Sequence, residues 1–216
     1  MAEARKDYIT FASAAEGLDE ETFIVVSLEG TETMNRPYRF EIGLVSLDPN
    51  IDSLALLKAP ATLGLKQGIL SSDGKKGLVT VTRTGVVAAF EQVGRQNEWT
   101  KYKAVLVPPL WRLSLSYQSR IFQNLSVPEI VEQVLKDAGI PADRFKFMPA
   151  TRTYPKREYA VQYEETDLDF IHRWLEHEGI LYWFQEIDGD VITVFGDAYA
   201  HYHDTNATVP FAQMQQ

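Results

Sequence analysis

Two groups of histidines are the side chains of this sequence most able to bind a metal ion. His172 and His177 lie five residues apart in a segment that is predicted to be helical. Rings at that spacing point about 140° apart on a helix, whereas a shared metal needs a spacing of three or four. We therefore expect two surface or rim histidines. His201 and His203, with Asp204, share a face if they lie on a strand. A metal at His201/His203 thus stays an alternative to a plain polar loop.

Six carboxylates between residues 164 and 178 could suggest acid–base hydrolysis of a glycan. Such chemistry needs two carboxylates on opposed walls of a cleft, which neighbours in sequence seldom provide. We expect instead a solvated patch at a helix start, where negative charge complements the helix dipole. No nucleophile elbow or glycine-rich phosphate loop is present. The sequence therefore predicts no catalytic, cofactor-binding or metal site, and no enzyme. The six residues are Glu164, Glu165, Asp167, Asp169, Glu176 and Glu178.

Composition restricts the class of partner. The chain has 216 residues, of which 45% are hydrophobic and 24% charged, as in folded globular proteins. A formal net charge of -9 argues against nucleic acid, since phosphate binding needs a positive face. There is no cysteine, which excludes disulfides and thiolate chemistry. No apolar run reaches the length of a membrane span or a signal peptide core. We expect synthesis in the cytoplasm, no membrane insertion and export without a cleaved signal.

Residues 1–115 are predicted to form mainly antiparallel strands. Tyr38, Phe40, Ile42 and Leu44 alternate with polar or small residues, which predicts the inward positions of a half-buried strand. Several such strands at this spacing are typical of an antiparallel barrel or sandwich. The other expected elements are strands over Thr22–Glu29, Ala61–Gln67, Leu78–Phe90, Trp99–Val107 and Trp111–Tyr117, and a helical turn at Leu54–Lys58.

Residues 116–216 are predicted to form an α+β module with two short helices. The first helix has Ser126 as its cap and Glu129 three residues later, which together match a capping box. The second begins at a weaker pair, Thr166 with Asp169, and ends before Gly179. Around them we expect a strand at Phe145–Phe147 and a hairpin of Ile180–Ile187 with Val191–Phe195 across Asp188–Gly189. The last stretch has no clear period, so we expect the module to be incomplete at its C-terminus.

Eight aromatic residues are concentrated in about 31 positions of this module. Most should pack in the core, and the remainder suits an interface, because tyrosine and tryptophan are enriched where subunits meet. They are Tyr154, Tyr159, Tyr163, Phe170, Trp174, Tyr182, Trp183 and Phe184.

Two long phrases carry a family resemblance. The segment Ser119–Leu135 contains SRIFQNLSVPEI, and Tyr154–Tyr163 reads YPKREYAVQY and continues into a helix phrase that ends at Glu178-Gly179-Ile180. Arg36–Phe40 and Ala59–Thr62 add two shorter matches. The chain, from about residue 23 to 194, resembles the N-terminal hub region of the type VI secretion spike protein (VgrG) family, which is related to the tail hubs of contractile phages.

The resemblance implies a fold and a set of partners. The fold would be an antiparallel β-barrel of the contractile-tail hub type with an adjoining α+β module. The chain would form a homotrimeric ring that docks on a hexameric inner tube, meets baseplate components and carries the piercing needle and effectors. It would be assembled in the bacterial cytoplasm and then ejected to the exterior or a target cell. No catalytic residue or cofactor comes with the resemblance, and a truncated piece and a short stand-alone relative remain equal alternatives.

A second function stays open from the residues alone. The aromatic and acidic side chains between Tyr154 and Phe184 also suit a monomeric β-rich domain that binds or hydrolyses a carbohydrate.

Overall fold

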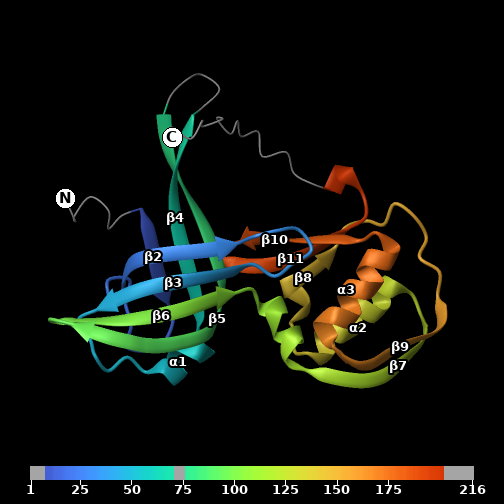
Figure 1. Cartoon of the computed structure of the whole chain (residues 1–216). Coiled ribbons are helices and arrows are strands. Elements are labelled where there is room, and N and C mark those ends of the chain that lie inside the picture. The colour runs from blue at the N-terminus through green and yellow to red at the C-terminus, as the bar shows by residue number, and fades with distance from the viewer. Residues whose placement is uncertain (1–7, 71–75, 202–216) are drawn as a thin grey trace, which may run out of the picture.

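A curled antiparallel sheet builds the N-terminal half of the molecule (Figure 1). The computed structural model describes residues 8–70 and 76–201. The sheet has six strands in the order β1-β4-β5-β6-β3-β2, so β1 and β2 are its edges. Its elements are β1 (Ile9–Ser13), β2 (Ile24–Thr31), β3 (Arg39–Ser46), β4 (Pro60–Leu70), β5 (Lys76–Gln96) and β6 (Trp99–Val107), with helix α1 (Ser53–Lys58) before β4. This half-barrel confirms the β-rich class expected from the alternating segments.

The predicted inward face of β3 is confirmed. Phe40, Ile42 and Leu44 are buried, and Tyr38, just before the strand, is fully enclosed. Because side chains alternate across a strand, Arg39, Glu41 and Val45 take the other face. The four inward residues join a cluster with Phe11, Phe23, Leu56, Leu63, Tyr102 and Leu106 inside the curl of the sheet.

The expected strand at Trp111–Tyr117 is wrong. Pro109–Leu115 forms a 3-10 helix, η2, and a strand begins only at Tyr117. Leu110 and Leu113 are buried, three residues apart, which is one turn of such a helix. Pro109 lies in the first turn, where its missing N–H costs no hydrogen bond. The alternating pattern is therefore coincidental, because the chain turns away from the sheet here.

The second half is an α+β part, as predicted (Figure 1). Strands β7 and β9 pair antiparallel as a two-stranded sheet, and β10, β11 and β8 form a three-stranded one. In the latter, β10 and β11 form the expected antiparallel hairpin and β8 is parallel to β11. The elements are β7 (Tyr117–Leu125), α2 (Val127–Asp137), η3 (Ala142–Arg144), β8 (Phe145–Phe147), β9 (Arg157–Thr166), α3 (Asp167–Glu178), β10 (Leu181–Ile187), β11 (Asp190–Gly196) and η4 (Tyr199–His201).

Both helices begin at the capping residues that the sequence predicts, and α3 also ends where it predicts. Glu129 Oε2 accepts from the backbone N–H and the hydroxyl of Ser126, each at 2.7 Å, which closes the capping box of α2. Thr166 Oγ1 accepts from the backbone N–H of Asp169 at 3.0 Å at the start of α3. Gly179 ends α3 with a φ of 63°, a conformation that glycine adopts without strain.

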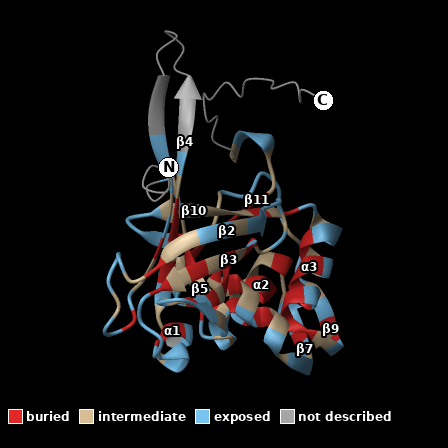
Figure 2. Cartoon of the chain, turned by 60° about the vertical axis from the view of Figure 1, so that its left-hand side comes forward, coloured by how far each residue is buried: buried red, intermediate tan, exposed pale blue. Residues whose placement is uncertain are grey.

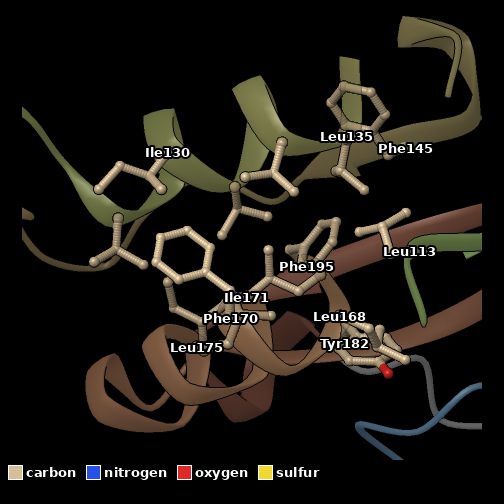
Figure 3. Packing of buried hydrophobic residues seen from close by; sticks show 14 of the residues in the cluster. Leu113, Ile130, Leu135, Phe145, Leu168, Phe170, Ile171, Leu175, Tyr182 and Phe195 are labelled. Carbon is tan, nitrogen blue, oxygen red and sulfur yellow. The ribbon is translucent and has the colours of Figure 1, made fainter. Parts of the chain in front are cut away.

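The second hydrophobic cluster lies between the two helices and the small sheets (Figure 3). The buried stripe of α2 is Val127, Ile130, Val131, Val134 and Leu135. Figure 2 shows the buried positions of α2 and α3 gathered on their facing sides. Phe184 of β10 packs against both clusters, and Val191 of β11 belongs to the first. The division at residues 115 and 116 therefore stays a prediction.

Candidate interaction surface

The acidic segment is mainly a set of structural contacts, centred on a buried carboxylate. Asp167, at the start of α3, accepts from Ser116 Oγ at 2.7 Å, from Arg120 Nη2 at 2.7 Å and from Gln162 Nε2 at 2.9 Å. Its side chain is only 6% exposed, and Gln162 is fully buried. Arg120 also reaches Asp137 at 3.1 Å. The expectation of a solvated patch is wrong for Asp167. Its carboxylate is enclosed, and three hydrogen-bond donors stabilise it where water would otherwise do so.

Most of the other carboxylates of the segment also bind neighbouring side chains. Glu178 pairs with Arg157 at 2.6 Å, and the Arg157 guanidinium lies over the Trp174 ring, 4.5 Å from its centre. Glu165 pairs with Arg173 at 2.5 Å. Asp169 accepts from Thr166 at the helix start, and Glu176 lies 4.0 Å from Arg36. The segment therefore places no two free carboxylates across a cleft.

The histidines do not converge on a metal. His172 is buried, which makes the expectation of a surface histidine wrong for it, whereas His177 is exposed and meets the Trp174 ring edge-on. His201 Nδ1 lies 3.6 Å from Asp197 Oδ1. His203 and Asp204 lie outside the described residues, so the alternative of a metal at His201/His203 stays untested. Among residues 8–70 and 76–201, no group of three or more metal-binding side chains occurs.

The eight aromatics separate into core and surface. Phe170 and Tyr182 are buried in the second cluster, which Trp174, Tyr154 and Phe184 border. Tyr154 donates to Asp197 Oδ2 at 2.8 Å. Trp183 is half-buried. Tyr159 and Tyr163 are 63% and 70% exposed.

These two tyrosines belong to an exposed apolar face on the β7–β9 ribbon, which we define as strands β7 and β9. Its inner residues, including Phe122 and Ala160, are buried toward the helices, and Phe122 stacks on Phe170 at 5.3 Å. Its outer face is apolar instead of polar. Ile121 lies opposite Val161 in the register. The exposed large side chains of this face are Tyr117, Ile121, Tyr159, Val161 and Tyr163, with Leu115 just before β7.

Sequence reasoning counts Tyr159 and Tyr163 among aromatics that suit an interface, but it does not predict the strands that carry this face. It uses Ser119–Leu135 and Tyr154–Tyr163 only for the family resemblance, although Tyr159, Val161 and Tyr163 alternate as on a strand. An apolar face of this kind usually marks a contact with another molecule.

A second surface feature is a hollow of about 490 Å³ on the curled sheet, beside edge strand β2. Val26 and Val93 provide its exposed apolar lining, and Lys103 pairs with Glu41 there at 2.7 Å. A bulge at Val25–Ser27 shifts the pairing of β2 with β3 next to it. Such bulges are common at sheet edges, where they end or redirect strand pairing.

Comparison with known proteins decides the family. The model of the phage tail baseplate hub (GPD) family matches residues 31–216. The chain belongs to the phage tail baseplate hub family. This hub chain is 38% identical over 197 residues to the type VI secretion system spike protein VgrG1b of Pseudomonas aeruginosa. The alignment covers 90% of the hub chain and 25% of VgrG1b. The resemblance to type VI spike proteins is thus confirmed.

Other relatives agree on fold and family. The hub chain is 32% identical over 199 residues to the actin cross-linking toxin VgrG1 of Vibrio cholerae, covering 88% of the chain and 17% of that protein. Among solved structures, the Escherichia coli c3393 protein matches with a TM-score of 0.76 and 25% identity, over 90% of the hub chain and 50% of its own. That protein is described as a type VI secretion component similar to the phage T4 tail proteins gp27 and gp5. The hub chain spans about a quarter of the length of the VgrG1b relative.

The described part of the chain contains no helix with the length and apolar composition needed to cross a bilayer.

Proposed function

We propose that this chain is a structural hub of a type VI secretion spike, which acts by association and has no turnover chemistry. The observation that carries the proposal is the hub-family match over residues 31–216, together with 38% identity to a spike protein. The placement of the acidic residues supports it. Five of the six carboxylates pair with an arginine, bind the residue that caps α3 or belong to the buried network around Asp167. These structural contacts compete with a role as a general acid or base.

The assembly we propose is a homotrimeric ring that docks on a hexameric inner tube and carries a piercing tip and effectors. It would form in the bacterial cytoplasm and then be ejected. Sedimentation of the chain over a range of concentrations should give a mass that rises toward three times that of the monomer. Binding to the tube protein should be strong for the trimer and weak for the monomer, because three linked contacts raise the overall affinity. A chain that stays monomeric at millimolar concentration and ignores the tube protein would refute this assembly.

The outer face of the β7–β9 ribbon suits a separate contact, with a baseplate component. The ribbon lies at the opposite end of the molecule from the curled sheet (Figure 1), so a ring built from the sheets leaves it accessible. Five large apolar side chains on one small ribbon can form the desolvated centre of an interface.

Surface variants separate the two contacts. Ile121→Asp places a charge in the middle of the ribbon face, at a side chain that is 65% exposed, so folding should be unaffected. Glu132→Lys, on the exposed side of α2, is the matched control, because it also changes a surface charge. We expect Ile121→Asp to abolish binding to the purified baseplate proteins and to leave the trimer and tube binding unchanged. Loss of the trimer in Ile121→Asp, with the control unaffected, would instead place the ribbon between hub subunits.

A further inference from the structure

The connection between β2 and β3 is fastened to the α+β part by two consecutive residues. The backbone N–H of Asn35 donates to the carbonyl of Tyr182 at 3.1 Å, and Asn35 Oδ1 accepts from the N–H of Tyr182 at 2.7 Å. Asn35 has a φ of 60°, which asparagine tolerates better than most residues. Arg36 Nη1 then lies 3.0 Å from Nδ1 of His172 on α3. The contacts of Asn35 and Arg36 thus join parts of the chain that are 147 and 136 positions apart.

The partners of His172 fix which nitrogen carries its proton. A guanidinium has donors and no acceptor, so the Arg36 contact requires an unprotonated Nδ1. The proton of the neutral ring must then be on Nε2, which lies 2.8 Å from Tyr182 Oη and donates to it. The His172 and Tyr182 rings also stack, with centroids 5.7 Å apart. The geometry therefore accommodates one tautomer of the neutral ring and not the imidazolium.

A second proton on His172 would occupy Nδ1. Arg36 Nη1 and His172 Nδ1 would then be two donors in contact, and both side chains would be positively charged. The charged groups around the ring are Arg36 from the β2–β3 connection, and Asp169 and Glu176 from α3 itself. Tyr182 from β10 is a hydroxyl whose pKa burial raises, so it stays neutral. Asp169 and Glu176 favour the imidazolium, but burial and Arg36 outweigh them and lower the pKa of His172 below its usual 6.5.

We propose that Arg36, His172 and Tyr182 form a pH-sensitive latch between the curled sheet and the α+β part. With neutral His172 the latch is closed, and protonation releases Arg36 and loosens the β2–β3 connection from α3 and β10. The Arg36 side chain is 61% exposed and can turn into water, and its other partner, Glu176 at 4.0 Å, is an exposed surface pair that holds it only weakly. The hydrogen bonds of Asn35 do not titrate, so they remain after Arg36 has left. Without the Arg36 contact these two bonds hold the connection, which is therefore held more weakly. The latch is a property of this joint and holds whether or not the chain assembles as proposed above.

The sign of the effect follows from proton linkage. The closed state has the lowered pKa, so it binds fewer protons than the open state. The contribution of the latch is complete above pH 6.5, and it is lost as pH falls from there through the lower pKa of the closed state. Between those two values the open population should rise about tenfold per pH unit.

The ring of His172 can be observed directly by NMR of the 15N-labelled chain. We expect its titration midpoint below 6.5 and its neutral form to be the Nε2–H tautomer. Arg36→Met keeps the stem of the side chain and removes the guanidinium, so the midpoint should rise. His177→Gln, at the exposed histidine of the same helix, should leave the His172 titration unchanged. A wild-type midpoint at or above 6.5, or an Nδ1–H tautomer, would refute the latch.

Hydrogen exchange tests the opening itself. His172→Gln is the decisive variant, because an amide can accept from Arg36 and donate to Tyr182 without titrating. At pH 5 the backbone amides of Asn35 and Tyr182 should exchange faster in the wild type than in His172→Gln, and at pH 8 the two proteins should agree. Comparison at the same pH removes the intrinsic pH dependence of exchange. Equal exchange of the two proteins at both pH values would overturn the proposal, as would a greater opening of His172→Gln at pH 5.

Discussion

Replacing Asp167 by alanine removes the carboxylate that joins the β7–β9 ribbon to α3. Three donors converge on it, at 2.7 Å from Ser116, 2.7 Å from Arg120 and 2.9 Å from Gln162. Gln162 is fully buried, and without Asp167 its Nε2 keeps one acceptor, the carbonyl of Glu165 at 3.2 Å. Arg120 keeps its second partner, Asp137, at 3.1 Å. Gln162 and Arg120 therefore each lose one hydrogen-bond partner and keep another.

The magnitude follows from those contacts. Breaking a buried ion pair by removing one partner costs about 3–5 kcal/mol. The lower end applies to Asp167→Ala, because Arg120 is 25% exposed and retains Asp137. Asp167→Asn keeps the shape and one good acceptor, and Ser116 can rotate its hydroxyl to accept from the new amide. That variant should cost about 1–2 kcal/mol, the difference between a charged and a neutral set of hydrogen bonds. A domain has about 5–15 kcal/mol of total stability, so Asp167→Ala should remain folded.

Urea unfolding followed by circular dichroism measures both variants. Loss of about 3 kcal/mol should also lower Tm by roughly 6–12 °C for a chain of this size. A double-mutant cycle with Arg120→Met isolates the charge pair, and its coupling energy should be about 1–3 kcal/mol. If Asp167→Ala unfolds at the wild-type urea concentration, the network has no structural role. The carboxylate would then need another explanation, such as acid–base chemistry, which the proposed function does not include.

Three further changes have definite expectations. Leu135→Ala, at a fully buried position of α2, should lower the free energy of unfolding by about 2–5 kcal/mol. In the same urea assay the exposed control Glu132→Ala should change it by no more than about 0.5 kcal/mol. Similar costs for the two variants would show that α2 does not pack as described. Gly179→Ala places a side chain at a φ of 63° and should cost about 1 kcal/mol, and an unchanged Tm would contradict the strain. Burial raises the pKa of Glu186, whose Oε1 accepts from the N–H of Thr84 at 2.6 Å. The folded state thus binds the proton of the Glu186 carboxyl more tightly than the unfolded state does. Stability should therefore fall as pH rises from the usual 4.5 through the raised pKa, and Glu186→Gln should flatten that pH dependence.

The elements that sequence predicted well are those with local signals. Both helices depend on contacts within three or four residues, such as Ser126 with Glu129 and Thr166 with Asp169, so their limits are readable from the chain. The buried positions of β3 were equally visible, because a period of two needs no knowledge of the partner strand. The segment Trp111–Tyr117 shows the weakness of that reasoning. It has the same period, but η2 buries Leu110 and Leu113 against the helices instead.

The missed features depend on partners distant in the chain. Arg120 and Asp167 are 47 residues apart, and Arg36 and His172 are 136 apart. Before the fold is known, Asp167 is one of six similar carboxylates, and His172 is one of two histidines on a helix. Periodicity gives the face of the helix on which each lies, but not the donor that meets it. Burial and charge pairing, which decide the role of both residues, come from tertiary structure alone.

The buried network and the apolar ribbon face are connected through the backbone of the same two strands. Arg120 and Gln162 come from positions adjacent to Ile121 and Val161, so the inner network holds the outer residues in register. A face that is rigid before binding loses less conformational entropy when a partner covers it. Asp167→Ala should therefore weaken binding at the ribbon without removing any contact side chain. Ile121→Asp should abolish that binding with stability unchanged. Comparison of the two variants separates a residue that positions the surface from one that touches the partner.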